Sequence, residues 1–366
     1  MRSSRRGDTH GILGAEIGEL EDLAASLGEA RFRGRQVFEW LHRHGVFCAG
    51  EMENIPRRFR EKLAGLSHGL PLEIAGSAQS EVDASRKFSL RLEDGHRVEA
   101  VLIPEKNRLA LCVSTQVGCA MGCLFCRTGR MGFVRDLDTA EIVAQYHAVR
   151  GTLQPGETIT HIVFMGMGEP LANFGSTLRA IKILTHPLGV GISPRRITVS
   201  TVGVVPALGM LLQQIPVHLT VSLNAADEAT RRELMPASRR YPLARVLEAL
   251  KKAPLPPRRR FTIAYVMIKG RNESPSDAEA LARLLRPLRC KVNLIPFNPF
   301  PSSALEPPPE EAVLRFQNTL RSKGITTHIR HSRGKDILGA CGQLGAEPGE
   351  SLEGERNHDA MAQCPA

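Results

Sequence analysis

The segment VGCAMGCLFC places three thiols, those of Cys119, Cys123 and Cys126, at C-x3-C-x2-C spacing. Because the segment directly follows a predicted strand, the three thiolates share one short loop. Three thiolates on such a loop can hold three corners of a 4Fe–4S cluster, and the fourth iron then lacks a protein ligand. An open iron can chelate a small molecule, whereas a cluster that only transfers electrons normally has four cysteine ligands. The spacing therefore predicts a cluster whose open iron binds a small molecule.

A structural zinc site is the alternative interpretation of this loop. Zinc would need a fourth cysteine or histidine at ordinary spacing. Cys112 lies seven residues before Cys119, inside the predicted strand, so the chain would have to fold back to bring it near the loop. The spacing thus favours the iron–sulfur cluster.

A second motif, FMGMGEP, ends a predicted strand and closes at Pro170. Glycines at the end of a strand let the backbone approach a ligand closely, and the carboxylate of Glu169 can receive an ammonium group. A dinucleotide-binding fingerprint is the competing interpretation, but Leu171 stands where its third glycine would be. The motif therefore indicates a second contact region for the small molecule.

Five further cysteines bring the total to eight. Cys112 stands in LCVS and Cys341 in GACGQL, and by composition alone either is an inert buried thiol or a reactive one. Cys48, Cys290 and Cys364 stand in no motif and are interpreted as inert. Because structural disulfides are rare in reducing compartments, clustered cysteines there indicate metal or redox chemistry.

Composition bounds the class of protein and its partners. The chain has 366 residues, of which 42% are hydrophobic and 23% charged, as in an ordinary soluble globular protein. The 48 Lys and Arg against 38 Asp and Glu give a formal net charge of +10, which favours nucleic acid as a partner. Aromatic residues make up 5%, too few for a stacking platform as the main binding device. No apolar stretch reaches the roughly 18 residues of a membrane helix, and no secretory signal is recognised, so a cytoplasmic location is expected.

Hydrophobic periodicity divides the chain into four parts. Residues 1–70 are predicted as an N-terminal helical domain, and the basic residues between Arg31 and Lys62 indicate contact with RNA, with solvated helix faces as the alternative. Residues 71–110 are predicted as a β extension with a hairpin turn at Asp94 and Gly95. Residues 111–342 form the core, and residues 343–366 are predicted as a disordered tail.

Within the core, strands alternate with helices, which predicts an α/β fold with a parallel sheet, open or closed as a barrel. The strands are expected at 161–165, 197–200, 218–223, 262–267, 291–296 and 326–329, and the helices near 139–149, 174–186, 204–213, 243–251, 275–286 and 310–321. In a barrel, ligand contacts lie at the carboxyl ends of the strands.

Over about residues 15–345 the chain resembles the RlmN/Cfr family of radical S-adenosylmethionine (SAM) RNA adenine methyltransferases. The matching segments are FRGRQVFEWLHRHG, LCVSTQVGCAMGCLFC, VFMGMGEPLANF, RRITVSTVGVVP, SLNAADEATRRELMP, NLIPFNPF and RGKDILGACGQL. The resemblance implies a partial (βα)6 barrel with a small N-terminal helical domain and a short β extension. It also implies that Cys119, Cys123 and Cys126 bind the 4Fe–4S cluster, and that SAM caps the open iron.

The resemblance further implies a role for three residues outside the cluster loop. Cys341 resembles the cysteine that takes a methyl group from one SAM before a second SAM supplies the radical. Cys112 resembles the partner that resolves the protein–RNA crosslink and ends in a disulfide with Cys341. Glu99 matches a glutamate that acts as a proton acceptor, with a solvated strand carboxylate as the alternative. Two SAM molecules would then be consumed per methylation.

The SAM pocket implied by the resemblance lies at predicted strand ends or in the loops after them. Its residues are Gly168, Glu169, Ser200, Ser222, Leu223, Asn224 and Asn298. Hydroxyl and amide groups suit a ribose and an amino-acid moiety. Asn224 departs from the family pattern, since many relatives carry histidine there. Arg127 and Arg130 make the stretch after the cluster loop more basic than the common form.

The expected product is 2-methyladenosine in 23S ribosomal RNA, with tRNA as a second candidate substrate. Methylation at adenine carbon 8, the Cfr activity, is the alternative within the family. An RNA-binding iron–sulfur protein without methyl transfer is disfavoured, since a binder needs neither Cys112 nor Cys341. An activase of a glycyl-radical enzyme is disfavoured by the basic N-terminal region and the paired thiols. A reducing electron donor such as flavodoxin, no membrane partner and a monomeric state are also expected.

Overall fold

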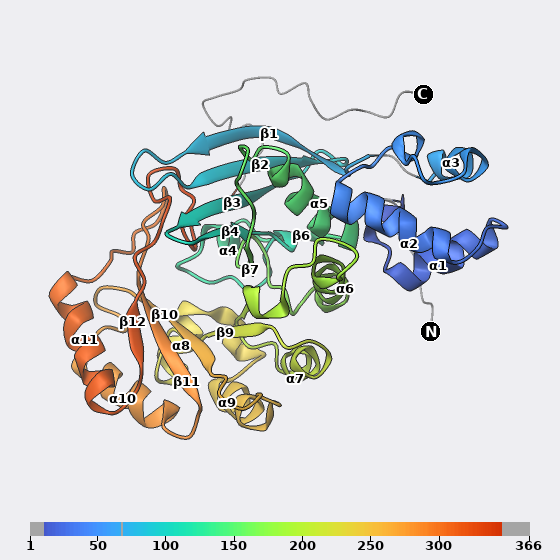
Figure 1. Ribbon diagram of the computed structural model, residues 1–366. Coiled ribbons are helices and arrows are strands. Elements are labelled where there is room, and N and C mark those ends of the chain that lie inside the picture. The colour runs from blue at the N-terminus through green and yellow to red at the C-terminus, as the bar shows by residue number, and fades with distance from the viewer. Residues whose placement is uncertain (1–10, 67–68, 346–366) are drawn as a thin grey trace.

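A computed structural model describes residues 11–66 and 69–345 of the chain. One ten-stranded mixed sheet runs through the molecule in the order β1-β2-β3-β4-β7-β8-β9-β10-β11-β12. Figure 1 shows the antiparallel strands β1–β3 at one end of this sheet, the parallel strands and their helices below them, and the N-terminal helices to one side. In the described part of the chain, no helix is both long and apolar enough to cross a membrane.

The core is a run of parallel strands joined through helices, because parallel neighbours need a crossover connection. Every neighbouring pair from β4 through β7 to β12 is parallel. The strands are β4 Arg108–Cys112, β7 His161–Phe164, β8 Ile197–Thr201, β9 His218–Ser222, β10 Phe261–Met267, β11 Cys290–Pro296 and β12 Thr327–Ile329. The helices are α5 Thr139–Arg150, α6 Phe174–Thr185, α7 Val205–Gln214, α8 Glu228–Leu234, α9 Leu243–Lys252, α10 Pro275–Leu285 and α11 Glu310–Ser322, with short turns η4 Pro194–Arg196 and η5 Pro236–Arg239. The predicted α/β class is confirmed.

The β extension continues the barrel sheet instead of forming a layer of its own. Strands β1 Leu72–Gln79, β2 Arg86–Leu92 and β3 Arg97–Glu105 are antiparallel, and β3 also pairs antiparallel with β4. The β2–β3 turn contains Gly95 at φ +83°, as its Asp-Gly sequence indicates. The register aligns Lys87 with Val101 and Val101 with Cys112, so these three residues share one face of the sheet.

A small second sheet holds the cysteine loop and was not expected. Strand β5 Gln116–Gly118 pairs antiparallel with β6 Phe133–Asp136, and the short helix α4 Arg127–Arg130 lies between them. Gly118 has φ +71°, and a Cβ there would overlap the carbonyl of Gly132. The two strands therefore bring the beginning and the end of the cysteine loop together.

The N-terminal region packs directly on the core. It contains η1 Gly11–Gly14, α1 Ile17–Ser26, α2 Phe32–Glu39, the π-helical turn η2 Trp40–His44, η3 Ala49–Glu51 and α3 Arg57–Ala64. A Cβ on Gly14 would lie 2.9 Å from the amide nitrogen of Ala140 in α5, and Arg179 of α6 donates to Glu19 at 2.6 Å. Apolar residues of both parts form one continuous core.

Many of the basic residues in this region already have acidic partners beside them. Arg31 and Arg35 pair with acidic residues of α1, and Arg43 pairs with Glu39. Arg57 lies 2.9 Å from Glu61 on α3. These pairs use part of the positive charge that the sequence suggested for RNA contact.

The close contact of α1 with α2 depends on Gly34, since a Cβ there would overlap the backbone of Leu20 and Glu21. We expect Gly34→Ala to lower the free energy of unfolding by about 1–3 kcal/mol, because the overlapped atoms belong to a helix backbone that must shift. Urea unfolding measures the change. Gly18→Ala on α1 is the matched control: a Cβ there meets nothing within 4 Å, so its stability should stay equal or rise. Equal stability of Gly34→Ala and the parent chain would contradict this account of the helix contact.

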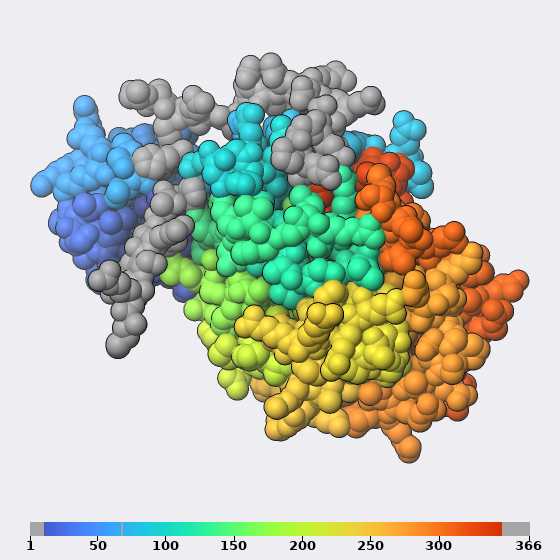
Figure 2. Space-filling view, turned by 180° about the vertical axis from the view of Figure 1, so that it is seen from behind, coloured from blue at the N-terminus to red at the C-terminus, as the bar shows by residue number. Residues whose placement is uncertain are grey.

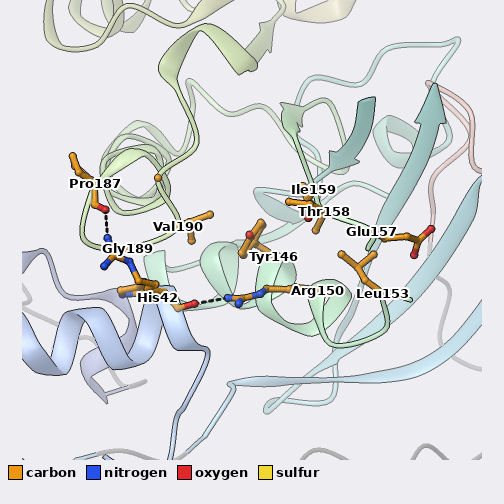
Figure 3. A pocket seen from close by; sticks show the side chains of 12 residues that line it. His42, Tyr146, Arg150, Leu153, Glu157, Thr158, Ile159, Pro187, Gly189 and Val190 are labelled. Atoms are coloured by element: carbon orange, nitrogen blue, oxygen red, sulfur yellow. Dashed lines mark hydrogen bonds between the residues drawn. The ribbon is translucent and has the colours of Figure 1, made fainter. Parts of the chain in front are cut away.

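A cavity of about 440 Å³ lies where the N-terminal region meets α5 and α6 (Figure 3). Arg150 donates to the backbone carbonyl of Arg43 at 2.9 Å, and Arg43 donates to the carbonyl of Pro187 at 2.7 Å. Residues Thr158 and Ile159 of its lining precede β7. The cavity is therefore at the amino ends of the strands, away from the end where a barrel places its chemistry.

Two fully buried histidines join the N-terminal region to α5. His42 Nδ1 and His147 Nε2 lie 3.4 Å apart, and the other ring nitrogen of each has no hydrogen-bond partner in the described part of the chain. Desolvation lowers the pKa of His42 to about 3 and that of His147 well below its usual value. Both rings are therefore neutral near pH 7.

The histidine pair should make the fold sensitive to acid. Because the pKa values rise to about 6.5 on unfolding, the unfolded state binds more protons below that pH, and stability falls as the pH drops from about 6.5 towards 3. Each histidine contributes a slope of about 1.4 kcal/mol per pH unit. Denaturant unfolding at pH 7 and pH 5.5 measures this slope. The variant His42→Leu should reduce the slope. The control His44→Gln, at an exposed position of the same turn, should leave it unchanged. An equal slope in His42→Leu and the parent chain would contradict the prediction.

Candidate active site

The cysteine loop lies at the carboxyl end of β4, beside the segment that follows β9. The amide of Leu124 donates to the carbonyl of Leu234 at 3.0 Å, and a Cβ on Gly122 would lie 3.7 Å from Pro236. Figure 2 shows the green segment around this loop next to the yellow segment near residue 230. The structure thus places the loop at the end of the barrel where chemistry was expected.

The three cysteines of the loop are held by backbone hydrogen bonds. Cys119 donates its amide hydrogen to Gly132 O at 2.7 Å, and Cys126 donates to Cys123 O at 3.1 Å. Cys119 and Cys123 are buried, and Cys126 is half-buried. The loop therefore fixes the three thiols in one compact, poorly solvated region.

The electrostatics of the three thiols suit a cationic group between them. Desolvation, together with nearby Cys126 and Glu169, raises the pKa of Cys119 to about 12. Burial likewise raises the pKa of Cys123, where Cys126 and Cys119 act in the same direction. Thiols that disfavour each other's ionisation become thiolate ligands when metal charge offsets the repulsion.

No group of three or more His, Cys, Asp or Glu side chains among residues 11–66 and 69–345 converges to hold a single metal ion. In an iron–sulfur cluster each thiolate binds a different iron, so its ligands need not meet at one point. Three mutually coupled thiols on one loop fit that ligand set.

The glycines of FMGMGEP bring the end of β7 against the strand that leads into the cysteine loop. A Cβ on Gly166 would lie 2.6 Å from Val113 O, and one on Gly168, at φ +99°, would lie 2.6 Å from Gln116 Cβ. These glycines therefore allow the end of β7 to approach residues 113–116 closely. Any larger residue would push the strand end away from the cysteine loop.

Glu169 is buried and links three segments of the site. Its two carboxylate oxygens accept the amide hydrogens of Val202 at 2.8 Å and Leu171 at 3.0 Å, and its own amide donates to Gln116 Oε1. Desolvation raises the pKa of Glu169 to about 7 in spite of these hydrogen bonds. The carboxylate therefore fixes the end of β8 relative to β7.

The remaining predicted SAM residues lie at the ends of β8, β9 and β11. Ser200 and Ser222 are half-buried, whereas Leu223 and Asn224 are fully buried. Asn224, at φ +59°, accepts from the amide of Val266 and donates to Met235 Sδ, so its side chain serves the fold. Among these residues the hydroxyls of Ser200 and Ser222 are the side-chain groups best placed for a ligand.

Asn298 has an unsatisfied acceptor at the site. Its amide group donates to the backbone carbonyl of Cys341 at 3.0 Å, while its Oδ1 is buried and has no hydrogen-bond partner in the described part of the chain. A buried acceptor without a partner is costly, so a donor group from a ligand would satisfy it. A ligand with an amino group at this place would satisfy the oxygen, as the predicted role of Asn298 requires.

The loop that carries Cys341 is tied to the cysteine loop. Arg127 donates its amide hydrogen to Gly342 O at 2.7 Å, and Thr128 Oγ1 donates to Leu344 O at 2.6 Å. Gly342, at φ +83°, leaves no room for a Cβ, which would lie 2.8 Å from Phe125 O. Residues 343–345, assigned from sequence to the tail, are buried here, and the rest of that predicted tail lies outside the described residues.

Cys112 and Cys341 are both free thiols in this structure. Cys112 is buried at the end of β4, and its pKa is raised by desolvation and by the nearby Cys341. Cys341 is exposed to solvent. Desolvation by the surrounding atoms still raises the pKa of its thiol, and the positive charge of Arg330 limits that rise. The structure therefore brings together the two thiols that lie outside the triplet.

Glu99, on β3, faces the Cys341 loop from the sheet. Its Oε2 accepts the amide hydrogen of Gly345 at 2.8 Å, and its Oε1 lies 3.1 Å from Lys87 Nζ. The side chain is buried, so the alternative of a solvated strand carboxylate is wrong.

Several polar residues of the site were missed from sequence. Gln116 connects β5 to Glu169 and Asp136, and Asn173 donates to the carbonyls of Thr115 and Leu137. Arg231 is fully buried and donates to Leu223 O and Val202 O, which joins the ends of β8 and β9. Asn173 and Arg231 each lie eight residues beyond the end of a predicted strand, so no local pattern singled them out.

The barrel and the cysteine loop at its carboxyl end define a radical SAM enzyme. Residues 113–285 match the model of the radical SAM superfamily, and residues 11–68 match the ribosomal RNA large subunit methyltransferase N-terminal domain. The dual-specificity RNA methyltransferase RlmN of Syntrophobacter fumaroxidans is 48% identical over 333 residues, covering 90% of this chain and 96% of the relative. The chain belongs to the RlmN family.

Other comparisons agree in sequence and in structure. The dual-specificity RNA methyltransferase RlmN of Anaeromyxobacter dehalogenans is 46% identical, with 95% of both chains covered. The crystal structure of a radical SAM methyltransferase from Sphaerobacter thermophilus has a TM-score of 0.87 at 42% identity and covers 92% of this chain and 99% of its own. The protein is therefore a SAM-dependent RNA methyltransferase that uses a 4Fe–4S cluster.

Proposed function

We propose that this enzyme methylates carbon 2 of an adenine in 23S ribosomal RNA, and also acts on tRNA, through a methyl group carried on Cys341. The observation that carries the proposal is the Arg127–Gly342 hydrogen bond, which keeps the Cys341 loop beside the cysteine loop. Cys119, Cys123 and Cys126 hold the cluster in this proposal. The action on two classes of RNA is supported by the dual specificity that the relatives' names state.

Cys341 suits the role of methyl carrier because it is the accessible member of the thiol pair. Its sulfur takes the methyl group of one SAM by displacement, and the thiol proton is lost. A cluster held by Cys119, Cys123 and Cys126 would supply one electron to a second SAM, and Cys341 would hold the methyl group from which the resulting radical takes a hydrogen atom. Adenine carbon 2 is not nucleophilic, so a carbon radical held by Cys341 can react where direct alkylation cannot.

Cys112 and Glu99 complete the reaction in this proposal. Bonding of the new carbon to carbon 2 leaves a radical on the adenine, which becomes closed-shell by losing one proton and one electron. Glu99 accepts the proton, and the electron would return to the cluster, which gave one electron to SAM. The thiolate of Cys112 then attacks the sulfur of Cys341, and the sulfur–carbon bond breaks with its electron pair passing to carbon. The carbon takes up a proton and becomes the methyl group, while the two sulfurs form a disulfide that a reductant must reopen.

Further parts of the proposal concern partners. A reducing donor such as flavodoxin supplies electrons, the protein acts as a monomer in the cytoplasm, and basic residues of the N-terminal region contact RNA phosphates. Arg58 supports the last point, because it is exposed and no partner for it is found among the described residues. Phosphate contacts release counterions, so RNA binding should weaken steeply with salt.

The test of the function is mass spectrometry of nucleosides from ribosomal RNA and tRNA treated with the anaerobically reconstituted enzyme, SAM and a reductant. The proposal expects 2-methyladenosine from both RNAs, with two SAM consumed for each methyl group transferred. 8-Methyladenosine would assign the enzyme to the alternative activity. One SAM consumed per product would refute the methyl-cysteine route.

A further inference from the structure

The buried contact between Lys87 and Glu99 was not expected from sequence. Both side chains are almost fully enclosed, at 3% and 4% exposed, and Lys87 Nζ lies 3.1 Å from Glu99 Oε1. The register of β2 and β3 pairs Glu99 with Ser89, which puts Lys87 at the diagonal position on the same face. No other ion pair of Lys87 is found among the described residues.

A lysine is seldom fully buried unless it is paired, because removing an ammonium from water costs several kcal/mol. Burying the carboxylate of Glu99 is costly for the same reason, and the attraction between the two charges offsets part of both costs. Such a pair is weak evidence for stability, since well-packed apolar residues often do as well. The position of this pair therefore calls for a functional account.

The pair contacts the loop of one thiol of the proposed reaction and shares a sheet face with the other. Glu99 Oε2 accepts the amide hydrogen of Gly345, four residues after Cys341. On the other side, Val101 lies between Lys87 and Cys112 in one row across the sheet. One oxygen of Glu99 is thus held by the lysine, and the other is turned towards the Cys341 loop.

We propose that Lys87 is a positioning residue for RNA methylation: it holds one oxygen of Glu99 and so keeps the other aimed at the Cys341 loop. The inference rests on the proposed function, in which Glu99 accepts the proton from adenine carbon 2. When that carbon–hydrogen bond breaks, the proton goes to Glu99, the electron pair stays on the adenine, and the one excess electron would return to the cluster. Without the ammonium, Glu99 Oε1 would lose its 3.1 Å contact, and the carboxylate could turn away from the Cys341 loop.

The experiment compares Lys87→Met, Lys87→Arg, Glu99→Gln and the double variant Lys87→Met/Glu99→Gln in single-turnover RNA methylation. Lys87→Met should slow methylation about a hundredfold, as expected for a lost general base, while methyl loading of Cys341, read by mass spectrometry of the protein, stays unchanged. Lys87→Arg should restore most of the rate. In the Glu99→Gln background, Lys87→Met should change the rate by less than about twofold, because it acts through the missing carboxylate.

Arg91→Met is the matched control, since Arg91 lies on the same strand in an ion pair with Glu73 but is 51% exposed, so its rate should be that of the parent. If Lys87→Met does not fold, the double variant still tests the inference, because it removes both buried charges. A double variant much slower than Glu99→Gln would overturn the role of Lys87.

Two outcomes separate this inference from the function beneath it. Slow methylation by Glu99→Gln together with a normal rate for Lys87→Met would overturn the positioning role and leave the proposed reaction intact. Normal rates for both single variants would remove Glu99 from the reaction, and the inference with it.

Discussion

Cys112→Ala should trap the RNA on the enzyme. In the proposed order of events, Cys112 acts only after the carbon carried by Cys341 has bonded to adenine. The variant should therefore load its methyl group and form the carbon–carbon bond but fail to release the product. We expect turnover to fall by at least about a thousandfold, on the scale of losing a catalytic nucleophile. A protein–RNA adduct that survives a denaturing gel is the measurement.

Two further variants make this result specific. Cys341→Ala should give neither methylated RNA nor adduct, because no sulfur remains to carry the methyl group. Cys290→Ala removes a half-buried thiol on β11 and should turn over normally. A Cys112→Ala enzyme that turns over normally without an adduct would return Cys112 to the class of inert buried thiols.

Cys126→Ala should abolish iron binding and SAM cleavage with little effect on the fold. Cys126 is the half-buried thiol of the triplet, and its loop is also held by the β5–β6 pair and by Arg127. Two thiols then remain for a cluster that needs three protein ligands here. Anaerobic reconstitution should give about four irons in the parent chain, as for a cluster with three cysteine ligands, and far fewer in the variant.

Cys112→Ala is the control for this experiment, since it removes a buried thiol near the site that is outside the triplet. It should retain the full iron content. Circular dichroism of Cys126→Ala should match that of the parent chain. Stoichiometric zinc without iron in anaerobically purified parent protein would contradict the cluster.

The core strands could be predicted because each is a short apolar run bounded by turn residues. The strand expected at 262–267 is β10 Phe261–Met267, and the one expected at 161–165 is β7 His161–Phe164. Strands β5 and β6 could not be predicted, since they have only three and four residues and pair with each other across the whole cysteine loop. Elements this short carry no periodicity.

The sequence predicted the thiols of the site but not the contacts that support them. Spacing singles out the cysteine triplet, whereas Lys87 alternates with apolar residues as an exposed strand residue would. Its burial depends on the register of β2 against β3 and on the distant Cys341 loop, which no local pattern encodes. Asn298 was predicted by position, but its unsatisfied oxygen is visible only in three dimensions.

Among the described residues, β1 and β12 are the two outer strands of the large sheet, and neither offers a long regular edge to a second chain. At one margin β12 has only three residues, and at the other the pairing of β1 is interrupted between Ile74 and Gly76. Short or irregular outer strands discourage edge-to-edge association, which otherwise leads to aggregation. These outer strands therefore offer a poor template to the sheet of a neighbouring molecule, so we expect little edge-to-edge association at high concentration.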